Sequence, residues 1–366
     1  MVETTYTIER KRHGLLERLL ESDSSEIKIL MLIGAALMMW FGLSYFATLI
    51  YPDNAASQNA LSSYLNYAMR NGGIFLLLCG GIQLILLARK TGETPIFTYI
   101  KTHKLRLKSA AISASVMTVI SLILFTIFIM SYSAIKTRIP VINPYQWDNS
   151  FMLLDRLIFM GQDPWKLFQW IYEFPVIIRT MDFIYDVWAA LLVGIWSLSF
   201  INRNHSPAIR YRFPIALMLT WFIGGTLLAI LFSSVGPCYF DLQTGQVGPY
   251  AEQMLILNQI HNDAPLRAVE YQSILWNVYE KGSLGLGGIS AMPSMHCGTS
   301  ALLVMLAWKH PIWRIVSLIF FAFIFISSFM LAWHYAVDGI FVIPVVLFAW
   351  WAAGKITHKI AGQEND

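Results

Sequence analysis

The sequence of 366 residues is short of charge. Only 13% of its residues are Asp, Glu, Lys or Arg, whereas 56% are hydrophobic. Soluble domains usually carry about 25% charged residues, so the composition argues against a water-soluble globular protein and favours a protein that lies in a bilayer.

Cysteine is also scarce. The three cysteines, Cys79, Cys238 and Cys297, are too few for the disulfide framework of a small secreted domain, and they do not have the spacing of a metal site. One disulfide between Cys238 and Cys297 stays open as an alternative. The chain contains no internal repeat and no low-complexity segment.

Charges are missing altogether from eight long stretches of the chain. Each stretch is close to or above the ~17–25 residues that a helix needs to cross a bilayer. A buried core helix could explain one such run but not all of them together. We therefore predict an all-α polytopic membrane protein with about eight transmembrane helices. The charge-free runs are 29–52, 71–88, 109–135, 187–202, 213–240, 282–308, 315–337 and 339–354.

The basic residues predict the orientation of the chain. Lys and Arg gather before the first run and then in every second segment between runs, which places these segments in the cytoplasm. Both termini are then cytoplasmic, and the long polar segments face the periplasmic or lumenal side. The predicted parts are a cytoplasmic amphipathic lead 1–28, two additional spans with a basic loop 29–108, a main membrane domain 109–356 with outer loops 136–186 and 236–292, and a cytoplasmic tail 357–366.

Two histidines are expected at the same face of the membrane. In "SAMPSMHCG", Pro293 and Ser294 suit a helix start, and His296 follows in the first turn. In "AWHYAVDG", His334 and Asp338 are four residues apart and share a helix face. Both predicted helices begin on the outer side, so the two motifs converge in depth.

These residue types suit phosphate chemistry. A helix N-terminus with a glycine-rich approach attracts anions, phosphate above all. A carboxylate can accept one imidazole N–H and leave the other nitrogen as a nucleophile or base. Taken singly, each residue has a simpler interpretation: His296 as a packing residue, Ser294 as a helix cap, and the His334–Asp338 pair as half of a metal site. The combination of motifs is what indicates a functional site.

The motifs resemble a known family. "PSMH" (293–296) and "HYAVD" (334–338) are similar to the second and third motifs of the type 2 phosphatidic acid phosphatase superfamily. The form H-Y-x-x-D resembles the branch of inositol-phosphorylceramide synthases and their bacterial relatives, as do "KTRIPVINPYQWDNSFMLLDRLIFMGQDPW" (136–165) and "VGPCYF" (235–240). The resemblance covers roughly residues 130–345 and implies a six-helix catalytic core formed by the later spans.

The resemblance also implies roles for individual residues. His334 would attack the lipid phosphorus and form a phosphohistidine, and Asp338 would orient it. His296 would protonate the leaving oxygen and then activate the acceptor as general base. Ser294 and the amides around it would hold the phosphate oxygens. No metal ion and no cofactor are expected, although a metal-dependent enzyme built on the same three residues is an alternative.

The sequence departs from the wider family at its cations. Simple phosphatase members carry K-x6-R-P and an arginine six residues before the third-motif histidine, where this chain has Ser328. We expect Lys136 or Arg138, in "KTRIP", to supply the phosphate clamp; an interfacial anchor is the alternative. Met295 stands where glycine is usual, and either narrows the site or faces lipid.

The predicted function is a phosphotransferase or phosphatase acting on a lipid phosphoester at the outer leaflet. The acceptor is water or an alcohol, with transfer of inositol phosphate to a lipid hydroxyl as one form. A plain lipid phosphate or isoprenyl diphosphate phosphatase is an alternative. A proton-coupled transporter, with the two histidines and Asp338 as a relay, is the alternative from another class. We expect no nucleic-acid partner, and the oligomeric state stays open.

Other polar residues of the outer segments have two interpretations. They could bind a polar head group, or they could cap helices and face solvent. His261 and Asp263 are expected in a turn. The aspartates concerned are Asp148, Asp155, Asp182 and Asp186.

Overall fold

The structure is a computed structural model. No strand occurs among the residues that it describes, and the regular structure there is helical. The predicted run 71–88 and most of the lead 1–28 lie outside the described residues. The described ranges are 24–52, 100–203, 205–281 and 287–362.

Long apolar helices dominate the described chain. Six of them are long and apolar enough to cross a membrane, and a shorter apolar helix, α16 (Met295–Ala307), lies among them. This confirms the predicted all-helical, multi-pass membrane protein. The candidate spans are α2 (Ser24–Ile50), α5 (Lys104–Lys136, with its span at Ala111–Ile142), α9 (Pro175–Ile201), the run Pro207–Leu231, α17 (Pro311–Met330) and α18 (Ala336–Ala361).

The run Pro207–Leu231 is made of several pieces. It begins with the short helix α10, and a π-helix follows the longer helix α11. Two glycines in that π-helix, Gly224 and Gly225, let the side chain of Met295 pack closely against the backbone. The pieces are α10 (Pro207–Arg210), α11 (Arg212–Phe222), the π-helix η3 (Ile223–Leu228) and α12 (Ala229–Leu231).

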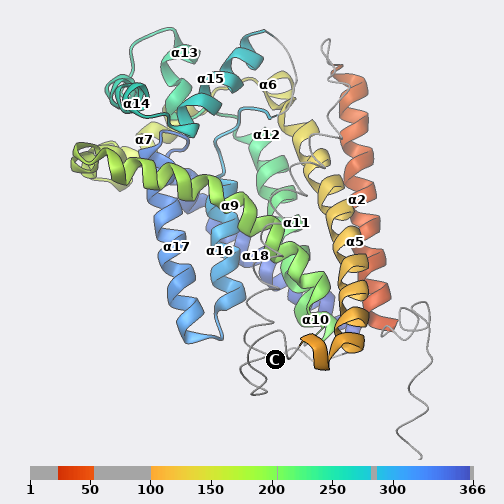
Figure 1. Cartoon of the computed structure of the whole chain (residues 1–366). Helices are drawn as coiled ribbons and strands as arrows, with labels where there is room; N and C mark the ends of the chain where they lie inside the picture. The colour runs from red at the N-terminus through yellow and green to blue at the C-terminus, as the bar shows by residue number, and fades with distance from the viewer. Residues whose placement is uncertain (1–23, 53–99, 204, 282–286, 363–366) are drawn as a thin grey trace, which may run out of the picture.

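Short helices cover one end of the bundle (Figure 1). This cap lies at the end where α16 and α18 begin. The first residues of α2 and the last residues of α18 lie at the opposite end, so the two ends of the described chain share one side of the bundle. The cap helices are α6 (Ile139–Ile142), α7 (Asp148–Ile158), α8 (Pro164–Leu167), η2 (Gln169–Glu173), η4 (Pro237–Tyr239), α13 (Phe240–Thr244), α14 (Ala251–Asp263) and α15 (Arg267–Glu280).

The ends of two helices differ from the ends of the charge-free runs. Helix α9 begins at Pro175 rather than near residue 187, because Asp182 and Asp186 are satisfied by contacts with α15 and so do not mark the helix end. Helix α16 begins only at Met295, since Ser294 is its N-cap. The predicted loop 136–186 therefore contains the first turns of a long helix.

Helix α16 lies between other helices of the bundle. It packs against α17, α18 and α11, whereas α2 packs mainly on α5 at the edge. Large aromatic side chains fill the space between α5 and α9, where the Phe128 and Trp196 rings stack 5.8 Å apart. This core places the start of α16 beside the start of α18, directly below the cap.

Candidate active site

The start of α16 presents His296 beneath the cap. Ser294 caps the helix by accepting the N–H of Cys297 at 3.4 Å. Its own backbone N–H donates to the carbonyl of Asp338 at 3.1 Å. A backbone hydrogen bond therefore joins the two motifs, whose histidines, His296 and His334, are 38 positions apart in the sequence.

The ring of His296 is held by aromatic packing. The Tyr185 ring stacks on it at 4.2 Å between centroids, and the Trp188 ring lies at the same distance at a tilt of 39°. Both residues come from α9 and are three positions apart, so they share one face of that helix. Helix α9 thus forms an aromatic wall behind the histidine.

His334 lies in the tight connection between α17 and α18, just before α18 begins. The carbonyl of Ser328 accepts the N–H groups of Trp333 and His334 at 3.0 and 3.1 Å. The His334 Nδ1 lies 3.2 Å from Oδ2 of Asp338. The ring centroids of His296 and His334 are 6.2 Å apart, so the two predicted histidines face each other across one site.

Asp338 is completely buried and serves two partners with one oxygen. Its Oδ2 accepts the backbone N–H of Tyr335 at 3.0 Å as well as facing His334. This contact forms part of a capping box at the N-terminus of α18. The carboxylate therefore fixes the helix start and the imidazole at the same time, and its negative charge favours an Nδ1–H tautomer of His334.

The electrostatic surroundings keep His334 neutral. Burial and the nearby positive charge of Lys136 lower the pKa of His334 to about 3, against the opposing effect of the Ala291 carbonyl. An imidazole with this pKa carries no charge near pH 7, and only a neutral imidazole has a lone pair for attack.

Helix α7 in the cap reaches the same loop with two carboxylates. Asp148 accepts the N–H of Val235, the N–H of Gly236 at 2.9 Å and the hydroxyl of Tyr335 at 2.9 Å. Asp155 accepts the first two N–H groups of α18, those of Ala336 at 2.9 Å and Val337 at 2.8 Å.

Burial raises the pKa of Asp155 to about 7, although its two N–H donors oppose this change. It also raises the pKa of Asp148, against the N–H groups of Gly236 and Val235 and the Tyr335 hydroxyl. Both carboxyl groups are 6% exposed or less. They are therefore not free to bind a polar head group, which was one of the two interpretations of these residues.

A glycine turn packs directly on the His334 loop. Gly236 has φ of +91°, and a Cβ at this position would lie 2.7 Å from the Trp333 carbonyl oxygen. Two further hydrogen bonds fix the turn. The N–H of Cys238 donates to the Ala332 carbonyl at 2.9 Å, and the N–H of Gly236 donates to Asp148. The segment "VGPCYF" thus forms one wall of the loop.

The two predicted cations differ in where they point. Lys136, at the end of α5, lies near enough to act electrostatically on both His296 and His334. Arg138 instead donates to the carbonyl of Tyr51, at the end of α2, and to Ala134 and Thr137. The structure brings Lys136, but not the guanidinium of Arg138, to the histidines.

Comparison with known proteins identifies the family. A family model of the PAP2 superfamily matches residues 149–352. The chain belongs to the PAP2 superfamily. The matched region contains α7 from its second residue, α9, α16 and α18 to Ala352. No curated protein and no solved structure matches the chain.

Within this PAP2 domain, the remaining predicted residues have structural contacts. Asp182 accepts the N–H groups of Arg267 and Ala268 at the start of α15, both at 2.8 Å, and Asp186 pairs with the Arg267 side chain. His261 accepts the N–H of Leu266 at 3.0 Å. Asp182 therefore acts as a cap, as one of its two interpretations proposed, and Asp186 forms an ion pair. The expected turn at His261 and Asp263 is wrong, because both residues lie in the last turn of α14. Cys238 and Cys297 are both free thiols, so the alternative of a disulfide between them is wrong.

Met295 does not face lipid. It is 7% exposed and packs on the two glycines of the π-helix, where a Cβ at Gly224 would lie 2.8 Å from its Cε. The interpretation that Met295 faces lipid is therefore wrong, and its side chain joins α16 to η3 by packing.

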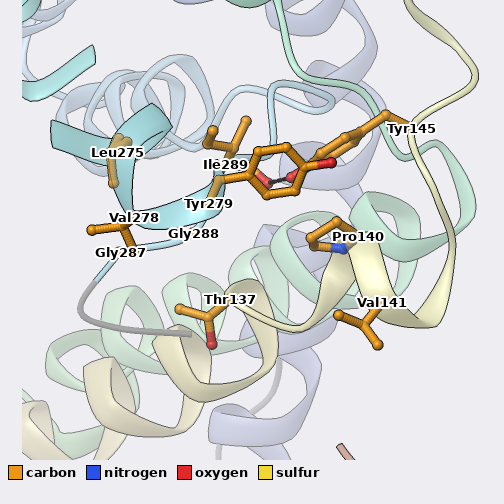
Figure 2. Close-up of a pocket in the computed structure, with 10 residues that line it drawn as sticks. All are labelled: Thr137, Pro140, Val141, Tyr145, Leu275, Val278, Tyr279, Gly287, Gly288 and Ile289. Atoms are coloured by element: carbon orange, nitrogen blue, oxygen red, sulfur yellow. Dashed lines mark hydrogen bonds between the residues drawn. The ribbon is translucent and has the colours of Figure 1, made fainter. Parts of the chain in front are cut away.

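A pocket of about 240 Å³ lies beside the site, between α6 and α15 (Figure 2). The rings of Tyr145 and Tyr279 form one wall, and Tyr145 donates its hydroxyl to the Ile289 carbonyl at 2.8 Å. None of the histidines lines it. Gly287, Gly288 and Ile289 line it from the segment that precedes α16, and a Cβ at Gly288 would lie 2.5 Å from the Lys136 carbonyl oxygen.

Among the described residues, no group of three or more His, Cys, Asp or Glu side chains is arranged to hold a metal ion. The residues that sequence reasoning missed are Tyr185 and Trp188 and the positions of Asp148 and Asp155. The aromatic pair had a visible pattern, namely two rings three residues apart. The aspartates had none, because their partners are backbone N–H groups far along the chain.

Proposed function

We propose that this membrane protein of the PAP2 superfamily transfers a phosphoryl group from a lipid phosphoester by way of a phosphohistidine on His334. The observation that carries the proposal is the pair of facing imidazoles, 6.2 Å apart, with a buried carboxylate behind one of them. A phosphorus atom between the rings would have a nucleophile on one side and a proton donor on the other.

In the first step, Nε2 of His334 attacks phosphorus while the bond to the leaving oxygen breaks. Asp338 accepts the Nδ1–H and stabilises the charge that develops on the ring. His296 donates a proton to the leaving oxygen. The negative charge of a bound phosphate favours the protonated form of His296 before the reaction.

In the second step, His296 takes a proton from the acceptor hydroxyl. The acceptor oxygen attacks phosphorus, the P–N bond breaks, and His334 returns to its neutral form. Phosphoryl transfer depends mainly on positioning and on charge stabilisation. Ser294, the N–H groups at the start of α16 and the ammonium of Lys136 would neutralise the phosphate oxygens, and Arg138 would serve as an anchor at the end of α2.

We further propose that the acceptor is an alcohol and that the reaction is head-group transfer, with inositol phosphate moved to a lipid hydroxyl. The form H-Y-x-x-D at 334–338 supports this proposal. The covalent intermediate would then be a phosphodiester on His334. The distribution of Lys and Arg supports a non-cytoplasmic active site with cytoplasmic termini.

The test uses the purified full chain in detergent with excess chelator. Phosphatidic acid, isoprenyl diphosphate and phosphatidylinositol are offered with ceramide, and products are followed by mass spectrometry and phosphate release. A new head-grouped lipid would support transfer, whereas free phosphate would identify a lipid phosphatase.

The matched variants are His334→Asn and His205→Asn, because His205 is exposed at the opposite end of the bundle. We expect turnover to vanish only in His334→Asn. Full activity in that variant would overturn the mechanism. Absence of any product from the wild-type protein, followed by proton-coupled flux in vesicles, would favour the transporter instead.

A further inference from the structure

Helix α7 buries charged side chains and exposes apolar ones, which is the reverse of a helix on a water-facing surface. It buries Asp148, Phe151 and Asp155 on one face. Leu157 follows Asp148 by nine positions, so at about 100° per residue it lies directly opposite. Leu157 is 79% exposed, and Leu153 on the same side is 59% exposed. A helix in water shows the reverse arrangement.

Hydrogen bonds fix the depth at which α7 lies. Asp155 binds the N–H groups of Ala336 and Val337, the first two residues of the candidate span α18. A helix joined by its side chain to the first turn of a span lies at the level where that span enters the bilayer. The exposed leucines therefore meet the boundary between head groups and acyl chains, not bulk water.

The apolar surface continues past the end of α7. Figure 1 shows that the start of α9 projects sideways past α17 at the same level. Arg156, in the last turn of α7, forms an ion pair with the buried Asp163 beyond the helix, with nitrogen–oxygen distances of 2.8 and 3.1 Å. The exposed apolar residues beyond α7 are Met160, Leu167, Trp170, Phe174 and Val176.

We propose that α7 is an interfacial helix: its face of Leu153, Leu154 and Leu157 lies among the lipid acyl chains of the leaflet at the active-site end, and Asp148 and Asp155 on its opposite face position the His334 loop. The second half of this proposal rests on the proposed function, whereas the first half does not. The helix that holds the nucleophile would then lie in the leaflet that supplies the lipid substrate.

The lipid contact can be measured without any activity. Leu157→Cys carries a nitroxide label in vesicles of phosphatidylcholine, and its collision rates with oxygen, which concentrates in lipid, and with a water-soluble nickel chelate are compared. Ile319→Cys on α17, where the native side chain is 65% exposed on a span, is the lipid reference. Asn262→Cys, exposed on α14, is the water reference. The parent protein, labelled in parallel, corrects for its own cysteines.

We expect the label at position 157 to behave like that at 319, with oxygen collisions dominating. Behaviour like that at 262 would overturn the interfacial placement. Protection from both agents would also overturn it, because it would mean that another protein surface covers the leucines.

The positioning role is tested with two aspartates that have the same local contacts. Asp155→Ala removes the acceptor of two N–H groups at the start of α18, and Asp182→Ala removes the acceptor of two N–H groups at the start of α15. We expect Asp155→Ala to lower kcat at least tenfold with little change in KM, and Asp182→Ala to lower only the unfolding temperature. Asp155→Asn, which keeps one oxygen acceptor, should recover part of kcat.

Equal effects of the two alanine variants on kcat would overturn the positioning role, since both would then act through stability alone. If the wild-type protein turns over no phospholipid, the proposed function fails and the positioning role fails with it. The spin-label result would still decide where α7 lies.

Discussion

His296 and His334 face each other, but they are held in different ways. His296 belongs to a helix, and two aromatic rings at 4.2 Å support its side chain. His334 precedes its helix, and it is supported by the hydrogen bonds that it donates to the Ser328 carbonyl and to the Asp338 carboxylate. A position set by a helix and by ring packing tolerates small polar changes, whereas a loop held by hydrogen bonds depends on single atoms.

The change expected to have the largest effect is Asp338→Asn. An amide retains an oxygen for the Tyr335 N–H but cannot stabilise a charged imidazole, and it disturbs the Nδ1–H tautomer of His334. We expect kcat to fall by about 10²–10⁴ in steady-state assays. The matching change beside His296 is Tyr185→Phe, which keeps the stacked ring and should have little effect on kcat. Similar losses in both variants would contradict the difference between the two histidines.

The next effect concerns the two cations at the end of α5. A hydrogen bond to a charged group contributes about 1.5–3 kcal/mol, so Lys136→Gln should lower kcat/KM by roughly 10–100-fold. Arg138→Gln should leave kcat/KM nearly unchanged and lower the unfolding temperature, because Arg138 anchors the end of α2. The reverse result would place the phosphate clamp on Arg138.

A glycine substitution tests the wall of the His334 loop. Gly236→Ala introduces a side chain at φ of +91° and a contact of 2.7 Å with the Trp333 carbonyl. We expect a loss of about 1–3 kcal/mol in the free energy of unfolding, together with a lower kcat. Gly245→Ala, at φ of +68° with no atom within 4 Å, should cost about 1 kcal/mol and spare kcat. Equal effects on kcat would show that the turn does not support the loop.

The smallest expected effect is a pH dependence. Burial raises the pKa of Asp155 from 3.8 to about 7. Between these two values the carboxyl ionises in the unfolded chain but stays protonated in the folded protein, so the folded protein loses stability as the pH rises through this window. Asp155→Asn does not titrate there. We therefore expect the unfolding temperature of the wild type to fall relative to that of the variant as the pH rises from about 4 to 7. A constant difference between the two proteins would contradict the raised pKa.

Several features of the fold follow from local chemistry and were predictable. Charge-free runs predicted the long apolar helices because a bilayer excludes charge over the length of a span. Pro293 and Ser294 predicted the start of α16, because capping depends on neighbouring residues. The depth of the two histidines followed from counting spans, since consecutive spans alternate in direction.

Other features were predicted less well, and the errors have a common cause. The charges of Asp182 and Asp186 led to the prediction that the helix begins near residue 187, whereas α9 begins at Pro175. A charged side chain within a helix can be satisfied by contacts with another element. His334 was expected in the first turn of a helix but lies just before α18, since Asp338 caps that helix from within. The sequence did not show which of Lys136 and Arg138 reaches the histidines. The two residues are only two positions apart near a helix end, so the direction of each side chain depends on where the helix stops.

The sequence by itself determined that this is a helical membrane protein and that the helices carrying His296 and Asp338 begin near each other, since hydropathy, capping and helical spacing act over a few residues. Only the tertiary structure decided that α7 turns its carboxylates to the start of α18 and its leucines outward, and that Tyr185 and Trp188 flank His296. These contacts join residues that are far apart in the chain, so they arise only when the helices pack.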